Sequence, residues 1–199
     1  MTQNPATDGS ISAACTKAIV DRLAQMSCRQ LHCSFTANRV CGRRLATVKR
    51  VLLTGMSGTG KSSVIGALAA RGYKAVDTDD GWCEPLPDGR QKWCEDAIEQ
   101  LLAIEDADVL FVAGCEENQV RFHPRFDSII LLSAPAGILA ERLASRTGNP
   151  YGKTPGELRR VFDDLQAVEP LLRKAAHYEI RTTMPLSEVV TAVLRLVGA

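Results

Sequence analysis

The chain has 199 residues, of which 45% are hydrophobic and 24% charged, and its formal net charge is +1 at pH 7. These values are ordinary for a soluble globular protein, and the length suits one domain with a buried core. They argue against a membrane protein, because no apolar run approaches the ~20 residues that a spanning helix needs. The N-terminus also lacks the apolar stretch of a secretory signal.

The first quarter of the chain differs from the rest in charge and in pattern. Residues 1–50 have a net charge of +6, whereas residues 51–199 have a net charge of −5. We expect residues 1–47 to be a basic, poorly ordered extension and residues 48–199 to form the domain. Such a segment can contact nucleic acid, but a solvated tail is the simpler interpretation and no nucleic-acid partner is expected. An alternative is that the native chain starts at Val48.

The sequence has seven cysteines, an odd number, and no secretion signal accompanies them. Reduced thiols and a cytoplasmic location are therefore expected. Cys28, Cys33 and Cys41 could be arranged with His32 around a zinc ion, but their spacing matches no standard finger or ribbon. We therefore expect no structural zinc.

Regular elements begin at Val48 and alternate between strands and helices. The patterns predict strands at residues 49–54, 73–77, 108–113, 128–133 and 178–182, and helices at 61–71, 91–105, 136–146, 155–175 and 186–197. A capping box, Thr154 with Glu157, marks the start of one helix. The third and fourth strands are continuous apolar runs, which indicates burial on both faces. The alternation predicts an α/β fold, a three-layer sandwich with a five-stranded parallel sheet.

The stretch GMSGTGKSS contains a complete G-x-x-x-x-G-K-S motif between an apolar strand and a helix. Its glycines let the backbone approach an anion, and its N–H groups converge on a phosphate. The lysine reaches the β- and γ-phosphates, and the serine after it supplies a hydroxyl for Mg²⁺. We predict that ATP is bound by Gly55, Ser57, Gly58, Thr59, Gly60, Lys61, Ser62 and Ser63. No N-K-x-D motif for reading guanine appears, but GTP stays open as an alternative donor.

The stretch VDTDDGW places Asp77 and Asp79 just past the second predicted strand. The carboxyl ends of parallel strands face the ligand crevice, so both residues should lie on the same side as the phosphate loop. A carboxylate there can hold Mg²⁺ or accept a proton from an attacking hydroxyl. Residues two apart on an extended chain point the same way. A polar turn without function is the alternative.

Arg142 and Arg146 are four residues apart and share a helical face ahead of a turn-rich loop that contains Lys153. We predict that these cations form a lid that stabilises the charge of a transferred phosphoryl group, although solvated surface arginines would look the same. The segment AGCEENQ follows the third strand, where Glu116 or Glu117 could assist Mg²⁺ or contact an acceptor.

Taken together, these motifs resemble the small-molecule and nucleotide kinase branch of P-loop proteins, and shikimate kinase-like proteins in particular. The resemblance covers about residues 48–198 and rests on GMSGTGKSS, the DTD of 77–79, the lid arginines and the tail EPLLRKAAHYEIRTTMPLSEVVTAVLRL. It implies a P-loop, nucleotide-kinase-like fold and an ATP- and Mg²⁺-dependent phosphotransferase. In that family the first aspartate of D-x-D assists Mg²⁺ and the second contacts the acceptor hydroxyl, which implies these roles for Asp77 and Asp79.

The sequence departs from that family at the acceptor end. Only about 28 residues separate Asp79 from the third strand, and AGCEEN replaces the expected glycine triplet. Val168 and Glu169 stand where an arginine is expected before the Pro-Leu of the tail. In the family these parts hold the shikimate carboxylate, so the resemblance implies another acceptor, with candidate contacts at Arg121, His123 and Arg125.

We therefore predict a kinase that transfers phosphate from ATP to an unidentified small molecule, as a monomer or homodimer. Its catalytic residues would be Lys61, Asp79, Arg142 and Arg146, and its metal ligands Ser62 and Asp77. The alternative is a nucleotide-binding regulatory ATPase without a small-molecule acceptor. An AAA-type motor is disfavoured, because the sequence has no clear Walker B carboxylate pair and no following helical lid domain.

Overall fold

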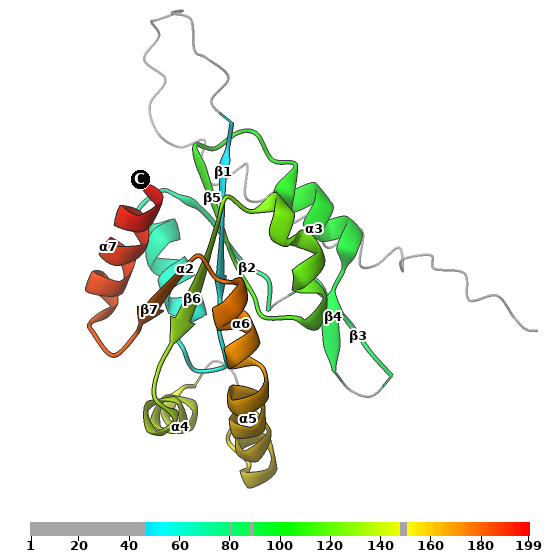
Figure 1. Cartoon of the computed structure of the whole chain (residues 1–199), viewed down its shortest axis with the longest axis vertical. Helices are drawn as coiled ribbons and strands as arrows, with labels where there is room; N and C mark the ends of the chain where they lie inside the picture. Colours follow the sequence, from blue (N-terminus) through cyan, green and yellow to red (C-terminus); the bar gives the residue numbers. More distant parts are fainter. Residues whose placement is uncertain (1–46, 80, 88–89, 148–150) are drawn as a thin grey trace, which may run out of the picture. The chain divides into compact units, whose positions relative to one another are not determined.

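The structure is a computed structural model that describes residues 47–199 apart from 80, 88–89 and 148–150 (Figure 1). The expectations for the basic extension and for a cysteine–histidine zinc site fall on residues outside this part, except for Thr47. Among the described residues, no helix has both the length and the apolar character needed to cross a membrane.

A five-stranded sheet forms the centre of the domain. Its strands are β1 (Lys49–Thr54), β2 (Lys74–Asp77), β5 (Val109–Ala113), β6 (Ser128–Ser133) and β7 (Tyr178–Arg181). Their order is β2-β5-β1-β6-β7, and every neighbouring pair is parallel. The predicted fold is confirmed. All carboxyl ends of the strands consequently lie at one edge, where β1 leads into the phosphate loop.

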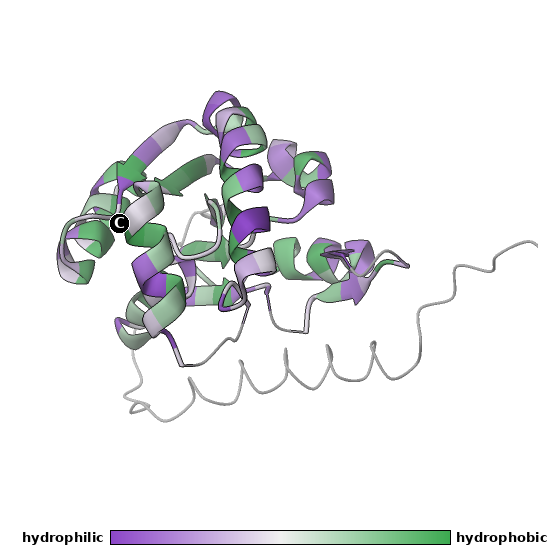
Figure 2. Cartoon of the chain, turned by 90° about the horizontal axis from the view of Figure 1, so that it is seen from below, coloured by the Kyte–Doolittle hydropathy of each residue, from purple (hydrophilic) through white to green (hydrophobic). Residues whose placement is uncertain are grey.

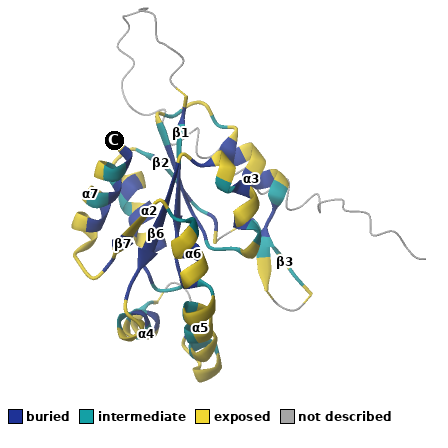
Figure 3. Ribbon diagram, in the orientation of Figure 1, coloured by how far each residue is buried: buried dark blue, intermediate teal, exposed yellow. Residues whose placement is uncertain are grey.

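Helices cover both faces of this sheet (Figure 1). On one face, α2 (Lys61–Ala70) and α7 (Leu186–Val197) pack against alternate strand residues such as Val51 and Leu53. On the other lie α3 (Glu95–Leu102), the 3₁₀ helix η1 (Glu117–Arg125) and α6 (Glu169–Ala175). The central strands β5, β1 and β6 are buried and largely hydrophobic (Figures 2 and 3), because both of their faces are covered, whereas the edge strand β7 buries only Ile180.

Two further helices follow β6 near its carboxyl end. Helix α4 (Ala136–Ser145) buries Leu139 and Leu143, and α5 (Pro155–Ala167) buries Val161 alone. The predicted capping box begins α5, since the Thr154 hydroxyl accepts the N–H of Glu157 at 3.3 Å and the Glu157 carboxylate accepts the N–H of Thr154 at 3.2 Å.

The structure corrects three predicted elements. Residues 91–105 do not form one helix, because Gln91–Trp93 is a strand, β4, that pairs antiparallel with β3 (Cys83–Pro85) before α3 begins. The predicted helix 155–175 is broken at Val168 into α5 and α6, where Pro170 has no N–H to continue the ladder. The 3₁₀ helix η1 was not predicted.

Candidate active site

The phosphate loop is held in a conformation that its glycines make feasible. Gly55 has a φ of 147°, and a Cβ there would lie 2.2 Å from the carbonyl oxygen of Leu132, so a larger residue would have to move β6. Thr59 closes the turn, because its buried hydroxyl donates to the Met56 carbonyl at 2.8 Å. Lys61 is also buried, and its Nζ donates to the Gly55 carbonyl at 2.7 Å.

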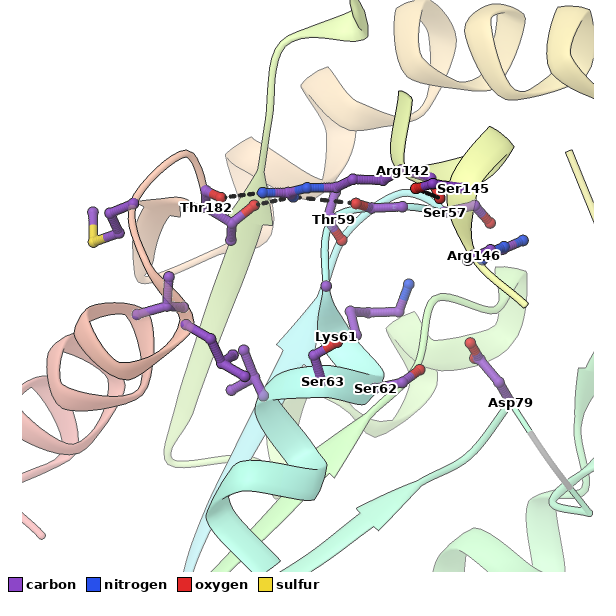
Figure 4. Close-up of a pocket in the computed structure, with 16 residues that line it drawn as sticks. Ser57, Thr59, Lys61, Ser62, Ser63, Asp79, Arg142, Ser145, Arg146 and Thr182 are labelled. Atoms are coloured by element: carbon purple, nitrogen blue, oxygen red, sulfur yellow. Dashed lines mark hydrogen bonds between the residues drawn. The ribbon is translucent and has the colours of Figure 1, made fainter. Parts of the chain in front are cut away.

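The loop opens into a cavity of about 700 Å³, which is the size of many small-ligand pockets (Figure 4). Of the predicted site residues, the cavity walls include Ser57, Gly58, Thr59, Gly60, Lys61, Ser62, Ser63, Asp79, Arg142 and Arg146. The structure thus brings together three segments that are separated in the sequence: the phosphate loop, the turn after β2 and the end of α4. Gly55 and Asp77 are not among the lining residues.

Asp79 stands on the cavity wall with its carboxylate close to several charges. Its side chain reaches solvent through the cavity, yet neighbouring atoms displace much of the water around it, and this partial burial raises its pKa. The positive charge of Lys61 opposes that rise, the negative charge of Asp77 adds to it, and Arg146 opposes it. A carboxylate with a raised pKa is a better proton acceptor than an ordinary aspartate.

Asp77 is the last residue of β2, and it does not lie on one extended segment with Asp79 as the sequence predicted. The chain turns at Thr78, so Asp77 and Asp79 do not continue one extended segment. The Asp77 Oδ1 accepts the backbone N–H of Asp79 at 3.2 Å. Asp77 therefore helps to hold the turn that carries Asp79, and a water-mediated contact with Mg²⁺ stays a prediction.

Arg142 ties two parts of the cavity wall together. Its Nη1 donates to the Gly58 carbonyl at 3.3 Å and to the Thr182 hydroxyl at 2.9 Å, and its Nη2 donates to the Thr182 carbonyl. These bonds, drawn in Figure 4, connect the phosphate loop to the end of β7. The guanidinium therefore supports the loop, and its predicted contact with the transferred phosphoryl group remains untested.

Arg146 is less fully bonded than Arg142. Its Nη2 donates to the Tyr151 carbonyl, while its buried Nε has no hydrogen-bond partner within the described part of the chain. Partial burial lowers the pKa of Arg146, and the nearby Asp79 carboxylate opposes that change. A half-bonded guanidinium on the wall opposite Lys61 is well suited to receive an anion (Figure 4).

The expected acceptor contacts on η1 are not at this edge of the sheet. Since η1 connects the carboxyl end of β5 to the amino end of β6, it leaves the crevice along its length. Arg121 pairs with Glu95 at 2.5 Å, and Arg125 pairs with Glu99. Burial and the charge of His177, which precedes β7, lower the pKa of His123. His123 therefore lies toward the amino ends of the strands, and only Glu116 and Glu117 stay near the crevice.

The donor set at the cavity edge fits Mg²⁺. The Ser62 hydroxyl and the Asp79 carboxylate line the cavity, and the Asp77 carboxylate lies beside it. These are oxygen ligands, which Mg²⁺ prefers, and in phosphate sites it takes few protein ligands beside phosphate oxygens and water. Over the described ranges no group of three or more His, Cys, Asp or Glu could hold a metal by itself. Any Mg²⁺ here would consequently need phosphate oxygens.

Sequence reasoning missed the wall of the cavity that lies beyond the phosphates. That wall consists of Val64, Ser145, Thr182, Met184, Leu186 and Val189. Thr182 could have been found, because it directly follows a parallel strand at the edge that carries the phosphate loop. Met184 and Leu186 are 37% and 44% exposed, and exposed apolar residues beside a phosphate site offer a surface for a nucleotide base.

Comparison with known proteins shows the family. A family model described as "AAA domain" matches residues 51–163, which include the phosphate loop, the Asp79 turn, Arg142 and Arg146. The chain belongs to this family. The AAA-domain chain is 28% identical over 171 residues to shikimate kinase 2 of Yersinia enterocolitica, an alignment that covers 74% of this chain and 95% of the relative. It is 32% identical over 157 residues to a putative adenylate kinase of Archaeoglobus fulgidus, covering 72% and 79%.

Solved structures share the fold of this AAA-domain chain. A shikimate kinase from Acinetobacter baumannii, solved in complex with shikimate, aligns with a TM-score of 0.56 and 18% identity over 77% of this chain and 94% of that one. A gluconokinase from Sinorhizobium meliloti aligns with a TM-score of 0.55 and 23% identity over 77% and 92%. The family match and the two relatives above make the chain a P-loop protein of the nucleotide kinase type, similar to shikimate kinase.

Proposed function

We propose that the protein transfers the γ-phosphoryl group of ATP to a hydroxyl of a small molecule, with Mg²⁺ as cofactor. One observation carries the proposal: the phosphate loop, Asp79 and Arg146 meet around a single cavity. A binding module needs the loop, but it has no need of a carboxylate with a raised pKa beside the phosphate lysine. Reduced thiols at Cys83 and Cys115 support a cytoplasmic setting for this activity.

In the proposed reaction the acceptor oxygen attacks the γ-phosphorus, and the bond between that phosphorus and the β,γ-bridging oxygen breaks with its electron pair remaining on ADP. Asp79 receives the hydroxyl proton. Lys61 and Arg146 stabilise the negative charge on the oxygens in transfer, and Arg142 keeps the phosphate loop in place. Ser62 and Asp77 would hold Mg²⁺, which when bound neutralises charge between the phosphates.

The test uses the purified full chain with ATP, Mg²⁺ and a library of small hydroxyl compounds, and it measures ADP release. We expect acceptor-dependent release that Lys61→Ala abolishes. Asp79→Asn should retain ATP binding by calorimetry but lower turnover by roughly 10²- to 10⁴-fold, the usual effect of losing a general base. Asp163→Asn, an exposed acidic position on α5, is the matched control and should leave turnover unchanged.

Two results would count against the proposal. Slow ADP release that no acceptor stimulates would favour a nucleotide-binding regulatory ATPase. Acceptor-stimulated turnover at the wild-type rate in Asp79→Asn would remove that residue from the mechanism.

A further inference from the structure

Glu116 lies just past the end of a central strand, at the edge of the sheet that carries the phosphate loop. It follows the carboxyl end of β5, whose last residue, Ala113, pairs with Asp77 at the end of β2. It therefore lies at the same edge of the sheet as Asp79. The charges of Asp79 and Lys61 both act on its carboxylate, which places it within electrostatic reach of the phosphate-transfer centre. The lining of the nucleotide cavity does not include it.

The β3–β4 hairpin fixes the position of the Glu116 carboxylate. Gln91 Nε2 donates to Oε1 at 2.8 Å. This donor is neutral, so the carboxylate is held in place without being neutralised. Partial burial raises the pKa of Glu116 and the charge of Asp79 adds to the rise, while the Gln91 hydrogen bond and the charge of Lys61 oppose it.

The basic side chains on this side of the molecule already have acidic partners. The pairs are Arg90 with Glu117 at 2.6 Å, Lys92 with Glu84 at 3.0 Å, Arg121 with Glu95 at 2.5 Å and Arg125 with Glu99. Such surface pairs are individually weak, but they leave each of these basic side chains with a carboxylate beside it. Four cations are matched by four carboxylates. Within the described ranges, Asp77, Asp79 and Glu116 form no ion pair.

The two cations of the phosphate site have another task. Lys61 belongs to the phosphate loop, and Arg146 stands beside Asp79 on the nucleotide side. If both engage phosphate oxygens, as the proposed function requires, neither compensates Glu116. An anionic acceptor would then bring a third negative charge toward two uncompensated carboxylates, Asp79 and Glu116, which electrostatics disfavours. A positively charged acceptor would supply the missing counter-charge.

We propose that the acceptor is a hydroxyl compound with a protonated amine, an amino alcohol or amino sugar, and that Glu116 selects it by pairing with the ammonium group. This inference rests on the proposed function and names the substrate class of the same site. Glu116 holds the ammonium, and the hydroxyl points to Asp79. The acceptor oxygen forms its bond to the γ-phosphorus, ADP leaves with the electrons of the broken bond, and the hydroxyl proton passes to Asp79.

The test compares acceptors that differ in charge on one skeleton. Glucosamine, glucose and gluconate form one set, and 3-amino-1,2-propanediol, glycerol and glycerate form a second. Each is supplied with ATP and Mg²⁺ to the full-length protein, and kcat/KM is obtained from ADP release. AMP is added as a phosphate-bearing acceptor. We expect the amine in at least one set to exceed its neutral and anionic counterparts by about tenfold or more, the effect of one charged hydrogen bond.

Variants assign the preference to Glu116. Glu116→Gln keeps the shape of the side chain and should reduce kcat/KM for the amine by about 10- to 100-fold, while leaving the neutral member of the set within about twofold. Asp163→Asn, at an exposed acidic position on α5, is the control. It should leave the ratio of amine to neutral acceptor unchanged. Glu116→Lys should shift the preference toward the anionic member.

The outcomes separate the two proposals. If gluconate, glycerate or AMP is the best acceptor, or if Glu116→Gln leaves the amine-to-neutral ratio unchanged, the inference about Glu116 is wrong while phosphotransferase activity stands. If no acceptor of any charge stimulates ADP release, the proposed function fails and this inference fails with it.

Discussion

Thr78 connects the turn that carries Asp79 to the core. Its side chain is fully buried, and its hydroxyl donates to the Ala113 carbonyl at 2.6 Å while accepting the indole N–H of Trp93 at 2.8 Å. Thr78→Val keeps the shape of the side chain but removes both bonds. The Ala113 carbonyl retains the backbone N–H of Thr78 at 2.9 Å, so the loss falls mainly on Trp93.

The expected cost follows from the position of the indole. Trp93 is 0% exposed, so water cannot replace the lost acceptor. An unsatisfied buried donor costs roughly 1–3 kcal/mol, and a lost neutral hydrogen bond adds about 1 kcal/mol. We therefore expect Thr78→Val to lower the free energy of unfolding by about 2–4 kcal/mol. That is a large fraction of the roughly 5–15 kcal/mol by which a native protein is usually stable.

Urea unfolding followed by tryptophan fluorescence measures this change. The chain has two tryptophans, Trp82 and Trp93, and both are buried beside Thr78 or in the adjoining hairpin. Thr191→Val is the control, because the exposed Thr191 hydroxyl donates to the Ser187 carbonyl of its own helix. It should change the free energy of unfolding by less than about 0.5 kcal/mol.

A double-mutant cycle isolates the orphaned indole. In a Trp93→Phe background no N–H remains to be stranded, so Thr78→Val should cost less than about 1 kcal/mol. The reasoning would be refuted if Thr78→Val cost less than about 0.5 kcal/mol in the wild-type background, or if it cost the same in both backgrounds.

Three further predictions concern other parts of the structure. Gly114→Ala would place a Cβ 2.3 Å from the Thr78 hydroxyl and should lower the free energy of unfolding by about 1–3 kcal/mol. Gly66→Ala has open space around its Cβ on α2 and should raise the free energy of unfolding by up to about 1 kcal/mol. Equal urea midpoints for the two variants would contradict this prediction. Arg142→Met should weaken ATP binding about tenfold in calorimetry, because the phosphate loop loses its tie to Thr182, and unchanged affinity would show that the tie is dispensable. Two hydrogen bonds from the Arg173 guanidinium lower the pKa of Glu179 to about 2, so the stabilisation by Glu179 is present above pH ~4.5 and is lost as the pH falls toward 2. In urea unfolding, Glu179→Gln should therefore cost about 1 kcal/mol at pH 7, after allowance for solvent screening, and progressively less below pH ~4.5. A difference between wild type and variant that stays constant with pH would count against the pair.

The parts of the fold that the sequence predicted well are those with a local cause. The phosphate loop needs glycines at fixed places, and Gly55 shows why, since any side chain there would strike β6. The buried strands are continuous apolar runs, and α7 places Val189, Val190, Val193 and Val197 on one buried face. In each case neighbouring residues in the sequence are sufficient to define the element.

The parts that escaped prediction depend on distant partners. Residues 91–105 show apolar residues four apart, which is a helical period, yet Gln91–Trp93 is extended. The reason is Asn118, whose Oδ1 accepts the Trp93 N–H at 2.9 Å and whose Nδ2 donates to the Trp93 carbonyl at 3.0 Å. Asn118 lies 25 residues farther along the chain, so no local pattern could reveal the contact.

In the candidate site too, residues with a local cause were predicted and residues that depend on distant contacts were not. The phosphate residues follow from their motif, and the place of Asp79 follows from the rule about strand ends. The direction of η1 was not predicted, so Arg121, His123 and Arg125 were expected at the crevice, although a connection from β5 to β6 must carry them away from it. The role of Arg142 as a tie to Thr182 requires the β7 contact, which only the folded chain provides.

The attachment of the β3–β4 hairpin through Asn118 bears on how such a protein can change during evolution. The donor end is embedded in the sheet, where altering one residue disturbs β1, β6 and α2 together. The hairpin that orients Glu116 is not hydrogen-bonded to the five-stranded sheet. The side-chain amide of Asn118 instead bonds both the N–H and the carbonyl of Trp93, as a neighbouring strand would do. New acceptors can thus be acquired by replacing a peripheral module, while the machinery for handling phosphate is inherited intact.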